Sequence, residues 1–365
     1  MRRPALASSA GDMPSPEAAE VVLSCREIAA CVDFFVDHGF RLESIFPADE
    51  PRRARLTGHG LRLALERGDR DGGGHLRIRA ERAREVTAPN GARLEFAPPP
   101  RPGPTWQRAT FFVRRGEAED GWHEGRAGML YRDLVGGRQD GSLIASRIRI
   151  PRGGPVRDYV HFHRVAAQVI YCRKGSVRVV YEDQGEPFLM RAGDCVLQPP
   201  EIRHRVLESS DELEVVEVSS PAEHETCVDH ELELPNDRID PAREFSGQRF
   251  VRHQGSGAVL QPWDIAGFDA RETGIAKASG GAVGVRVVRP AEPDAAGELS
   301  HRDDRRFWFV LRGALTLRRG GEAHRLTTDA ACVLPPGEAL TVTECTADLE
   351  LLEVAHNRQD SRRSV

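Results

Sequence analysis

Short runs of alternating apolar and polar residues dominate the larger, C-terminal part of the chain. The clearest are residues 147–150, 169–172, 176–183, 195–198 and 213–218, with Gly, Pro and Asp standing between them. Side chains of a strand alternate between the two faces of a sheet, so this pattern predicts strands with one buried face. Many short strands at regular spacing favour a sandwich or a barrel.

The same pattern returns further along the chain. It recurs in residues 283–290, 307–313, 314–320, 332–340 and 349–354. Two stretches align by eye: Gln168 to Gly175 matches Arg306 to Gly313, and the Cys-Val-Leu at Cys195 matches the one at Cys332. This repetition predicts an internal duplication of a β module.

The N-terminal part has a different pattern. Residues 21–25 form a short apolar run, and in residues 26–39 apolar side chains recur at helical spacing before Gly39. Residues 40–46, 53–60 and 61–66 then alternate again. The predicted order is therefore strand, helix, strand, strand, strand.

Composition shifts divide the chain. Residues 1–18 are rich in Ala, Ser and Pro, which is typical of a mobile tail, and residues 98–105 form a stiff proline-rich stretch. The predicted organisation is a tail (1–18), an α+β module (19–98), a Pro/Gly-rich linker (99–125), a first β module (126–236), a second β module (237–357) and a tail (358–365).

Length, charge and cysteine content exclude several classes of protein. The 365 residues are enough for two or three domains. No apolar run approaches the roughly 20 residues that span a bilayer, and the first residues lack the apolar core of a secretory signal. Seven cysteines without a CxxC pair suit a reducing cytoplasm. A net charge of −5 gives no basic field for nucleic acid. We expect a cytoplasmic protein with a small-molecule substrate and no membrane or nucleic-acid partner.

Three histidines carry the candidate chemistry. His161 and His163 are two residues apart on a predicted strand, so their side chains share one face. His204 follows a Pro-Pro turn at the start of another predicted strand, and Gln168 lies on the strand between. Three imidazoles on one face of a metal leave positions open for substrate or O2, and they suit Fe(II), Mn, Ni, Co, Cu or Zn.

These residues resemble the two sequence motifs of the cupin family. The first motif is filled by His161, His163, Gln168 and Gly175, and the second by Gly193, Pro199 and His204, with Glu201 where glycine is usual. The resemblance implies a small double-stranded β-helix barrel with the three histidines as metal ligands. The family's usual fourth ligand is glutamate, where this chain has Gln168.

The glutamine changes what the site can do. A neutral amide oxygen brings no charge and cannot act as a general base. We therefore expect a three-histidine site in which Gln168 is either an optional ligand or a hydrogen-bonding neighbour of the ligands. The alternative is that the histidines are ordinary polar residues on a barrel surface.

The second β module lacks most of these groups. Its counterparts of His161, His163, Gln168 and His204 are Leu299, His301, Arg306 and Leu340. With leucine at two positions, we expect no metal there, as in two-barrel cupins that keep one active half. Arg306 either contacts an anionic ligand or forms a salt bridge.

Residues 20–97 resemble part of the glyoxalase/bleomycin-resistance/extradiol dioxygenase superfamily, which has the vicinal oxygen chelate fold. The resemblance rests on residues 31–51, 58–68 and 88–96, and it places Glu95 where that family has a glutamate ligand. The stretch is too short for paired modules, so a docking or dimerising role is the stronger expectation, with Glu95 an exposed strand residue.

Several further residues are weaker candidates. Arg203, Arg205, Arg147 and Arg149 flank the site, and one of them, Arg203, is assigned to hold a substrate carboxylate. Tyr159, Tyr171 and Gln198 either line the pocket or pack in the core, and His224 either closes the barrel mouth or lies on the surface. Cys172 and Cys195 are predicted to be buried apolar residues without nucleophilic character.

The sequence thus predicts a mainly β protein with two tandem cupin barrels after an N-terminal α+β (βαβββ) module. The leading functional hypothesis is a non-haem Fe(II) dioxygenase of a small anionic substrate, because a neutral ligand set leaves the metal's charge to attract it. A second hypothesis is a metal- or metabolite-binding sensor. A third is an isomerase or lyase, which needs a base such as Glu201 or Glu217. The resemblance to cupins, whose exposed sheet edges commonly pair, implies a homodimer.

Overall fold

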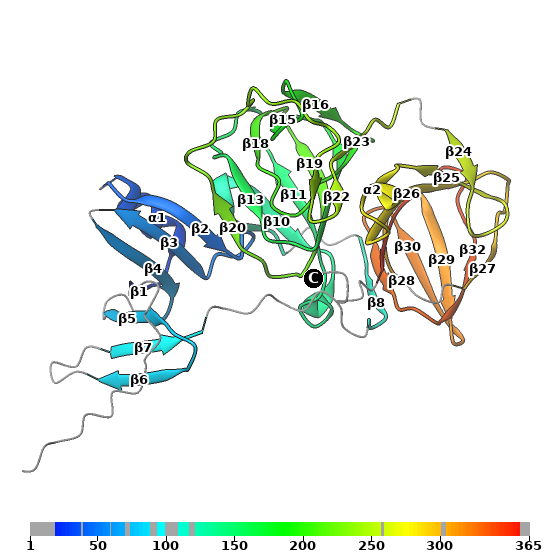
Figure 1. Cartoon of the computed structure of the whole chain (residues 1–365). Helices are drawn as coiled ribbons and strands as arrows, with labels where there is room; N and C mark the ends of the chain where they lie inside the picture. Colours follow the sequence, from blue (N-terminus) through cyan, green and yellow to red (C-terminus); the bar gives the residue numbers. More distant parts are fainter. Residues whose placement is uncertain are drawn as a thin grey trace, which may run out of the picture. The chain divides into compact units, whose positions relative to one another are not determined.

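The computed structural model is mainly β (Figure 1). It describes residues 19–37, 39–58, 60–69, 74–87, 93–98, 109–116, 121–256, 259–300 and 304–357. The predicted tails, 1–18 and 358–365, lie outside the described residues. No described helix combines the length and the apolar run needed to cross a membrane. The chain forms two compact units, one of residues 1–45 and 51–101 and the other of residues 46–50 and 102–365.

The first unit is one mixed sheet with a helix. Its elements are β1 (Ala19–Cys25), α1 (Ile28–Asp37), β2 (Arg41–Phe46), β3 (Arg53–Gly58), β4 (Leu61–Arg67), β5 (Gly74–Arg79), β6 (Arg84–Thr87) and β7 (Arg93–Ala97). They follow the predicted order strand, helix, strand, strand, strand, and three more strands extend the sheet to β2-β3-β4-β1-β5-β7-β6. Helix α1 contacts β3 and β4 and buries Ile28 and Val32.

The first β module of the second unit consists of two facing sheets. Its elements are β9 (His123–Glu124), η1 (Arg126–Gly128), β10 (Leu130–Asp133), η2 (Gly136–Gln139), β11 (Ile144–Ile150), β12 (Gly154–Pro155), β13 (His161–His163), β14 (Ala167–Lys174), β15 (Ser176–Tyr181), β16 (Phe188–Arg191), β17 (Cys195–Leu197), β18 (His204–Ser209), β19 (Leu213–Ser220), β20 (Thr226–Val228) and β23 (Val251–His253). One sheet contains β16-β15-β18-β13-β20, and the other runs β23-β17-β14-β19-β11-β10-β9. Between them lies an apolar core that includes Val179, Met190 and Val215.

The second β module repeats this plan. Its elements are β8 (Phe112–Arg114), β24 (Leu260–Pro262), β25 (Phe268–Glu272), α2 (Ile275–Ala278), β26 (Val283–Pro290), β27 (Gly297–Ser300), β28 (Asp304–Arg312), β29 (Ala314–Arg319), β30 (Glu322–Thr327), β31 (Ala331–Leu334), β32 (Ala339–Thr343) and β33 (Glu350–Asn357). Its sheets are β24-β25-β26-β33-β28-β31-β8 and β27-β32-β29-β30. A hairpin of β21 (Glu244–Phe245) and β22 (Gln248–Arg249) precedes the module.

Two boundaries differ from the sequence-based prediction. Strand β8 falls inside the predicted linker, yet it pairs with β31 and belongs to the second module. Strand β23 falls beyond the predicted start of the second module, yet it pairs with β17 of the first. Both are three-residue strands, too short to show a period, so only their pairing assigns them.

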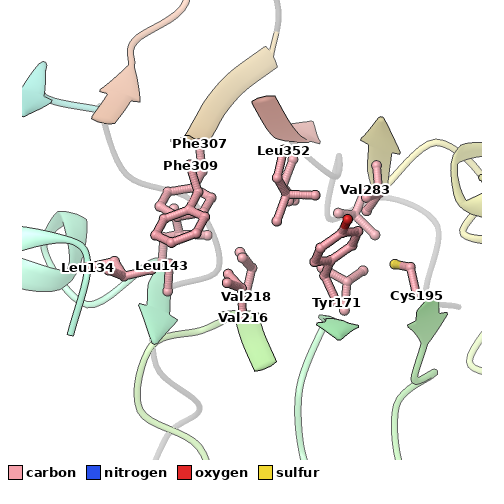
Figure 2. Close-up of a cluster of buried hydrophobic side chains, with 14 of the residues drawn as sticks. Leu134, Leu143, Tyr171, Cys195, Val216, Val218, Val283, Phe307, Phe309 and Leu352 are labelled. Atoms are coloured by element: carbon pink, nitrogen blue, oxygen red, sulfur yellow. The ribbon is translucent and has the colours of Figure 1, made fainter. Parts of the chain in front are cut away.

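The two β modules pack against each other through their larger sheets. Tyr171, Val216 and Val218 of the first module meet Phe307, Phe309 and Leu352 of the second in one buried cluster (Figure 2). Alternate residues of β14 divide between two environments: Val169 and Tyr171 join this cluster, whereas Ile170 faces the interior of its own module. Burial of both sheet faces explains why β14 has few polar positions.

A buried ion-pair network lies beside this cluster. Arg147 donates two hydrogen bonds to the Glu214 carboxylate at 2.7 and 2.9 Å, and Arg173 donates a third at 2.8 Å. Both arginines also pair with Asp329 of the second module, Arg147 at 3.2 Å. The network therefore joins the two modules, and it accounts for the charged residues on otherwise apolar strands.

Strand registers support the predicted duplication and correct its alignment. Both β14 and β28 have a bulge near their end, between Cys172 and Lys174 and between Val310 and Arg312. However, Ile170 pairs with Val196, whereas its counterpart Trp308 pairs with Cys332. Cys332 is thus equivalent to Val196 and not to Cys195, so the alignment made from the sequence was wrong by one residue at this strand. A shift of one residue moves a side chain to the opposite face of the sheet.

Gly313 marks the turn after β28, as Gly175 does after β14. Its φ is +73°, and a Cβ there would lie 2.9 Å from the Leu349 Cα atom. We expect Gly313→Ala to lower the free energy of unfolding by about 1–3 kcal/mol, measured by urea denaturation. Gly320→Ala is the matched control, because Gly320 has φ +54° but open space around it. An equal loss in both variants would contradict the steric part of this account.

Candidate metal centre and cavity

The three predicted histidines lie together inside the first β module. Residue pairing across β13 and β18 places His161 directly opposite His204, and His163 follows on the same face of β13. One ring nitrogen from each lies within 4.8 Å of the other two, and all three residues are buried. The structure therefore confirms that the three imidazoles form one cluster, and it excludes the surface alternative.

Backbone and hydroxyl groups hold the three rings in one orientation. The Nδ1–H groups of His161 and His204 donate to the carbonyls of Tyr159 (2.8 Å) and Ile202 (3.0 Å). His163 Nδ1 lies 3.0 Å from the Thr226 hydroxyl. A neutral imidazole that donates through Nδ1 keeps a lone pair on Nε2. This is how metal-binding histidines are held in proteins.

Burial keeps the three rings neutral. It lowers the pKa of His204 to about 4, and with nearby positive charges it holds the pKa values of His161 and His163 well below the usual 6.5. A metal ligand must be deprotonated, and these rings meet that condition at neutral pH without losing a proton. The donor set fits a divalent transition metal.

Two side chains donate to the inward-facing nitrogens. The Arg126 Nη2 group donates to His161 Nε2 at 3.0 Å, and the Gln198 amide donates to His204 Nε2 at 3.3 Å. The same amide group donates to Gln168 Oε1 at 3.0 Å, and Tyr181 donates to Gln198 Oε1 at 2.7 Å. Gln168 thus reaches the histidines through Gln198, which favours the hydrogen-bonding alternative over a fourth ligand.

Arg126 is the functional candidate that the sequence did not reveal. It is the first residue of η1, and it forms an ion pair with Asp158, whose carboxylate is fully buried. Asp158 also accepts from the backbone N–H groups of Tyr159 and Val206, both at 2.9 Å. Arg126 stands in an irregular Arg- and Gly-rich stretch, so no periodic pattern pointed to it.

Arg203, the predicted catalytic arginine, lies outside the cavity lining. It donates to Asp229 at 3.1 Å, and its guanidinium stacks 4.1 Å from the Phe162 ring centre. The reason is strand alternation: Arg203 neighbours His204, so the two side chains point to opposite faces. Arg147 and Arg149 likewise point away from the cavity, toward Glu214. The arginine at the cavity is Arg126.

The histidines face a cavity of about 100 Å³. Besides the triad, its polar lining includes Arg126, Gln198, Tyr181, Glu217 and His224, and its apolar lining includes Ile148, Ile150, Ile170, Val177, Val179, Met190, Val206, Leu213 and Val215. His224 is thus part of the lining, with its ring centre 5.4 Å from that of His163. Tyr159 is half exposed and Tyr171 lies between the modules, so neither lines the cavity.

Glu217 is a buried carboxyl group in this cavity. Burial raises its pKa to about 7, although hydrogen bonds from Gln168 and Ser219 lower it in part. By contrast, burial raises the pKa of the Cys172 thiol to about 12 and that of Cys195 further still, which agrees with their predicted lack of nucleophilic character. Glu217 is therefore the group in the cavity that titrates near neutral pH. Glu201, the other predicted base, does not line the cavity.

Glu217 is expected to destabilise the protein at high pH. A carboxyl whose folded pKa is raised above its unfolded value stabilises the fold only when protonated, so stability falls as pH rises from about 4.5 through 7. Glu217→Gln should raise the free energy of unfolding by about 1–3 kcal/mol at pH 8 and leave it nearly unchanged at pH 4.5. The exposed Glu208→Gln variant is the control. A Glu217→Gln variant less stable than wild type at pH 8 would contradict this assignment.

The second module has no such arrangement among its described residues. Leu299 pairs with Leu340 across β27 and β32, as His161 pairs with His204, and both leucines are buried in the module's core. His301 lies outside the described residues. Arg306 forms salt bridges with Glu353 (3.0 Å), Asp304 (2.8 Å) and Asp264 (2.7 Å), so its side chain is engaged within the module.

Glu95 of the first unit is also ion-paired. It lies 2.8 Å from His75 Nε2 and accepts from Arg77 at 3.0 Å, and its side chain is 31% exposed. Arg77 also donates to Glu66 at 2.7 Å. Glu95 was predicted to be an exposed strand residue, but it is half-buried and belongs to a network of charged side chains on the sheet.

Comparison with known proteins finds one matching family model. A model described as a cupin domain matches residues 146–219, which contain all three clustered histidines. Among solved structures, the chain is similar to the Escherichia coli protein YlbA (10% identity, 70% of this chain and 94% of that chain, TM-score 0.48). It is also similar to Bacillus subtilis oxalate decarboxylase (15%, 69% and 77%, 0.48) and to Streptomyces albus HEPD with 2-hydroxyethylphosphonate and Fe(II) bound (14%, 69% and 77%, 0.48). Comparison with curated proteins finds no match.

Proposed function

We propose that the first β module is a metal-dependent cupin enzyme that acts on a small anionic substrate, and that its reaction is dioxygenation at Fe(II). One observation carries the proposal: three buried, neutral imidazoles converge beside one cavity, and a neighbouring group holds each ring at Nδ1. The substrate would chelate through two oxygen atoms. A neutral ligand set leaves the full charge of a divalent ion to attract that anion.

The residues around the triad have separate roles in this proposal. His161, His163 and His204 hold the ion, which supplies a Lewis acid for substrate oxygens and a position for O2. Gln198, fixed by Tyr181 and Gln168, lies against His204 Nε2, so it would border a substrate bound to the ion. Arg126, held by Asp158, receives the anionic group of the substrate. The apolar walls exclude water from the reacting groups.

The remaining modules have supporting roles. We propose that the two β modules are tandem cupin barrels, the second having lost its site to the buried leucine pair. The N-terminal unit, of vicinal-oxygen-chelate type, would serve assembly into a homodimer in the cytoplasm. Its α1 exposes Phe34, which is 56% exposed, on the side away from the sheet.

Metal analysis followed by oxygen uptake tests the function. The purified protein is assayed for bound metal, reloaded anaerobically with Fe(II), and mixed with O2 and a panel of catechols, hydroxybenzoates, diketones and short hydroxy acids. The proposal predicts one metal per chain and substrate-dependent O2 consumption. Stoichiometric metal without O2 uptake on any substrate would exclude the dioxygenase and leave a sensor or the following alternative.

A second candidate function is proton transfer in an isomerase or lyase. It is favoured by Glu217, a carboxyl group inside the cavity whose pKa lies near 7, the range suited to a general base. This alternative predicts solvent deuterium incorporation into the substrate under anaerobic conditions, lost in Glu217→Gln. Deuterium incorporation without O2 uptake would favour it over dioxygenation.

A further inference from the structure

Strand registers place the polar and apolar linings of the cavity at different depths. In one sheet, Tyr181 pairs with His204. Val179 pairs with Val206, which lies two residues beyond His204 on β18. In the facing sheet, Ser146 pairs with Glu217, Ile148 with Val215 and Ile150 with Leu213. Two residues of a strand span about 7 Å, so from about 7 Å beyond the histidines these rows are apolar apart from Tyr131, which pairs with Ile148 and also lines the cavity. The cavity has a polar end and an apolar end.

Charge is confined to the polar end. Arg126 is the one arginine or lysine among the residues described as lining the cavity, and it lies against His161. Its Nε atom is buried without a hydrogen-bond partner, so the guanidinium still has a donor to offer. At the apolar end, isoleucine, valine and leucine offer nothing to a charged group. Burying a carboxylate there without a partner is costly.

The cavity is also small. Its volume of about 100 Å³ is below the roughly 150 Å³ of an apolar cavity known to hold benzene. The volume therefore limits the hydrocarbon tail of a bound molecule to a few carbon atoms.

From these observations we infer the substrate class: a short aliphatic monoanion that chelates through two adjacent oxygens and buries an uncharged hydrocarbon tail. The inference rests on the proposed function, because a substrate needs a chelating group only if the histidine triad holds a metal ion. Arg126 selects an anionic head group. The apolar side chains beyond it exclude a substrate that carries a second charge; they are the pairs Val179 with Val206 and Ile148 with Val215. Dicarboxylates are the excluded class.

Two hydroxy acids of nearly the same shape test this inference. 2-Hydroxy-4-methylpentanoate and malate share a chelating head, and they differ in an isopropyl against a carboxylate at the tail. Binding is measured by calorimetry on protein loaded with Ni²⁺, after metal content has been determined. We expect the aliphatic acid to bind at least about tenfold more tightly than malate. In Arg126→Met, binding of the aliphatic acid should weaken about tenfold or more while bound metal is retained.

The outcomes separate the two proposals. Bound metal with malate binding as tightly as the aliphatic acid would overturn the substrate class and leave the metal site intact. Unchanged binding in Arg126→Met would overturn the role of Arg126. Protein that holds no metal at the triad would overturn the proposed function, and this inference with it. Val179→Ser replaces an apolar side chain of the cavity wall by a smaller polar one without adding charge. In this variant, the ratio of the dissociation constant of malate to that of the aliphatic acid should decrease.

Discussion

Replacing His163 by alanine is expected to reduce bound metal from about one ion per chain to less than about a tenth. His163 supplies one of the three clustered nitrogens, and no other residue that the structure describes joins this cluster. Its Nδ1 is held by Thr226, so a neighbouring group could take its place only by rearrangement. Even changes to the groups behind a metal ligand cost about 10–100-fold in affinity, so loss of a ligand should cost more. Metal content after dialysis, by plasma emission spectrometry, gives the result.

The His253→Gln variant is the control for this prediction. His253 lies on β23, at the edge of the same module, and it is not part of the histidine cluster. Its variant should keep a full complement of metal. Full metal content in His163→Ala, with a circular dichroism spectrum like that of wild type, would mean that the ion binds elsewhere.

Replacing Glu214 by glutamine is expected to lower the free energy of unfolding by about 3–5 kcal/mol. Glu214 is 2% exposed and accepts hydrogen bonds from Arg147 and Arg173, which would then depend on Asp329 to balance their charges. Removing one member of a buried ion pair leaves an uncompensated charge in a medium of low polarity. The midpoint of urea unfolding, followed by tryptophan fluorescence, measures the loss.

An exposed ion pair provides the matched control. Glu244 and Arg249 on the β21–β22 hairpin lie 2.6 Å apart, but both side chains are more than half exposed. Surface pairs contribute about 0–1 kcal/mol, so Glu244→Gln should change stability by no more than that. Similar small losses in both variants would show that the Glu214 network does not hold the two β modules together.

The histidine cluster could be predicted because its signal is local. His161 and His163 share a strand face by alternation, and the resemblance to the two cupin motifs brings His204 to them. The alignment of the two β modules identified Leu299 and Leu340 as counterparts of His161 and His204, and the strand register confirms that pair. The sequence was sufficient to predict which side chains lie together where their spacing along one strand decides it.

The rest of the site depends on contacts that no local pattern encodes. Arg126 reaches His161 from an irregular segment, and only the buried Asp158 carboxylate fixes its direction. Arg203 was predicted to hold a substrate carboxylate. It neighbours His204, so the alternation of side chains turns it away from the cavity. Glu217 sits on an apolar strand, where the sequence alone does not tell a cavity-facing carboxyl from one in an ion pair such as Glu214.

Anomalous diffraction from crystals loaded with Fe(II) under anaerobic conditions tests the central claim most directly. The account predicts one strong iron peak in the first β module, about 2.0–2.2 Å from the Nε2 atoms of His161, His163 and His204, with Arg126 displaced from His161. It predicts no comparable peak between Leu299 and Leu340. An iron peak that lies away from the triad, or a triad that stays hydrogen-bonded to Arg126 and Gln198 at saturating Fe(II), would contradict it.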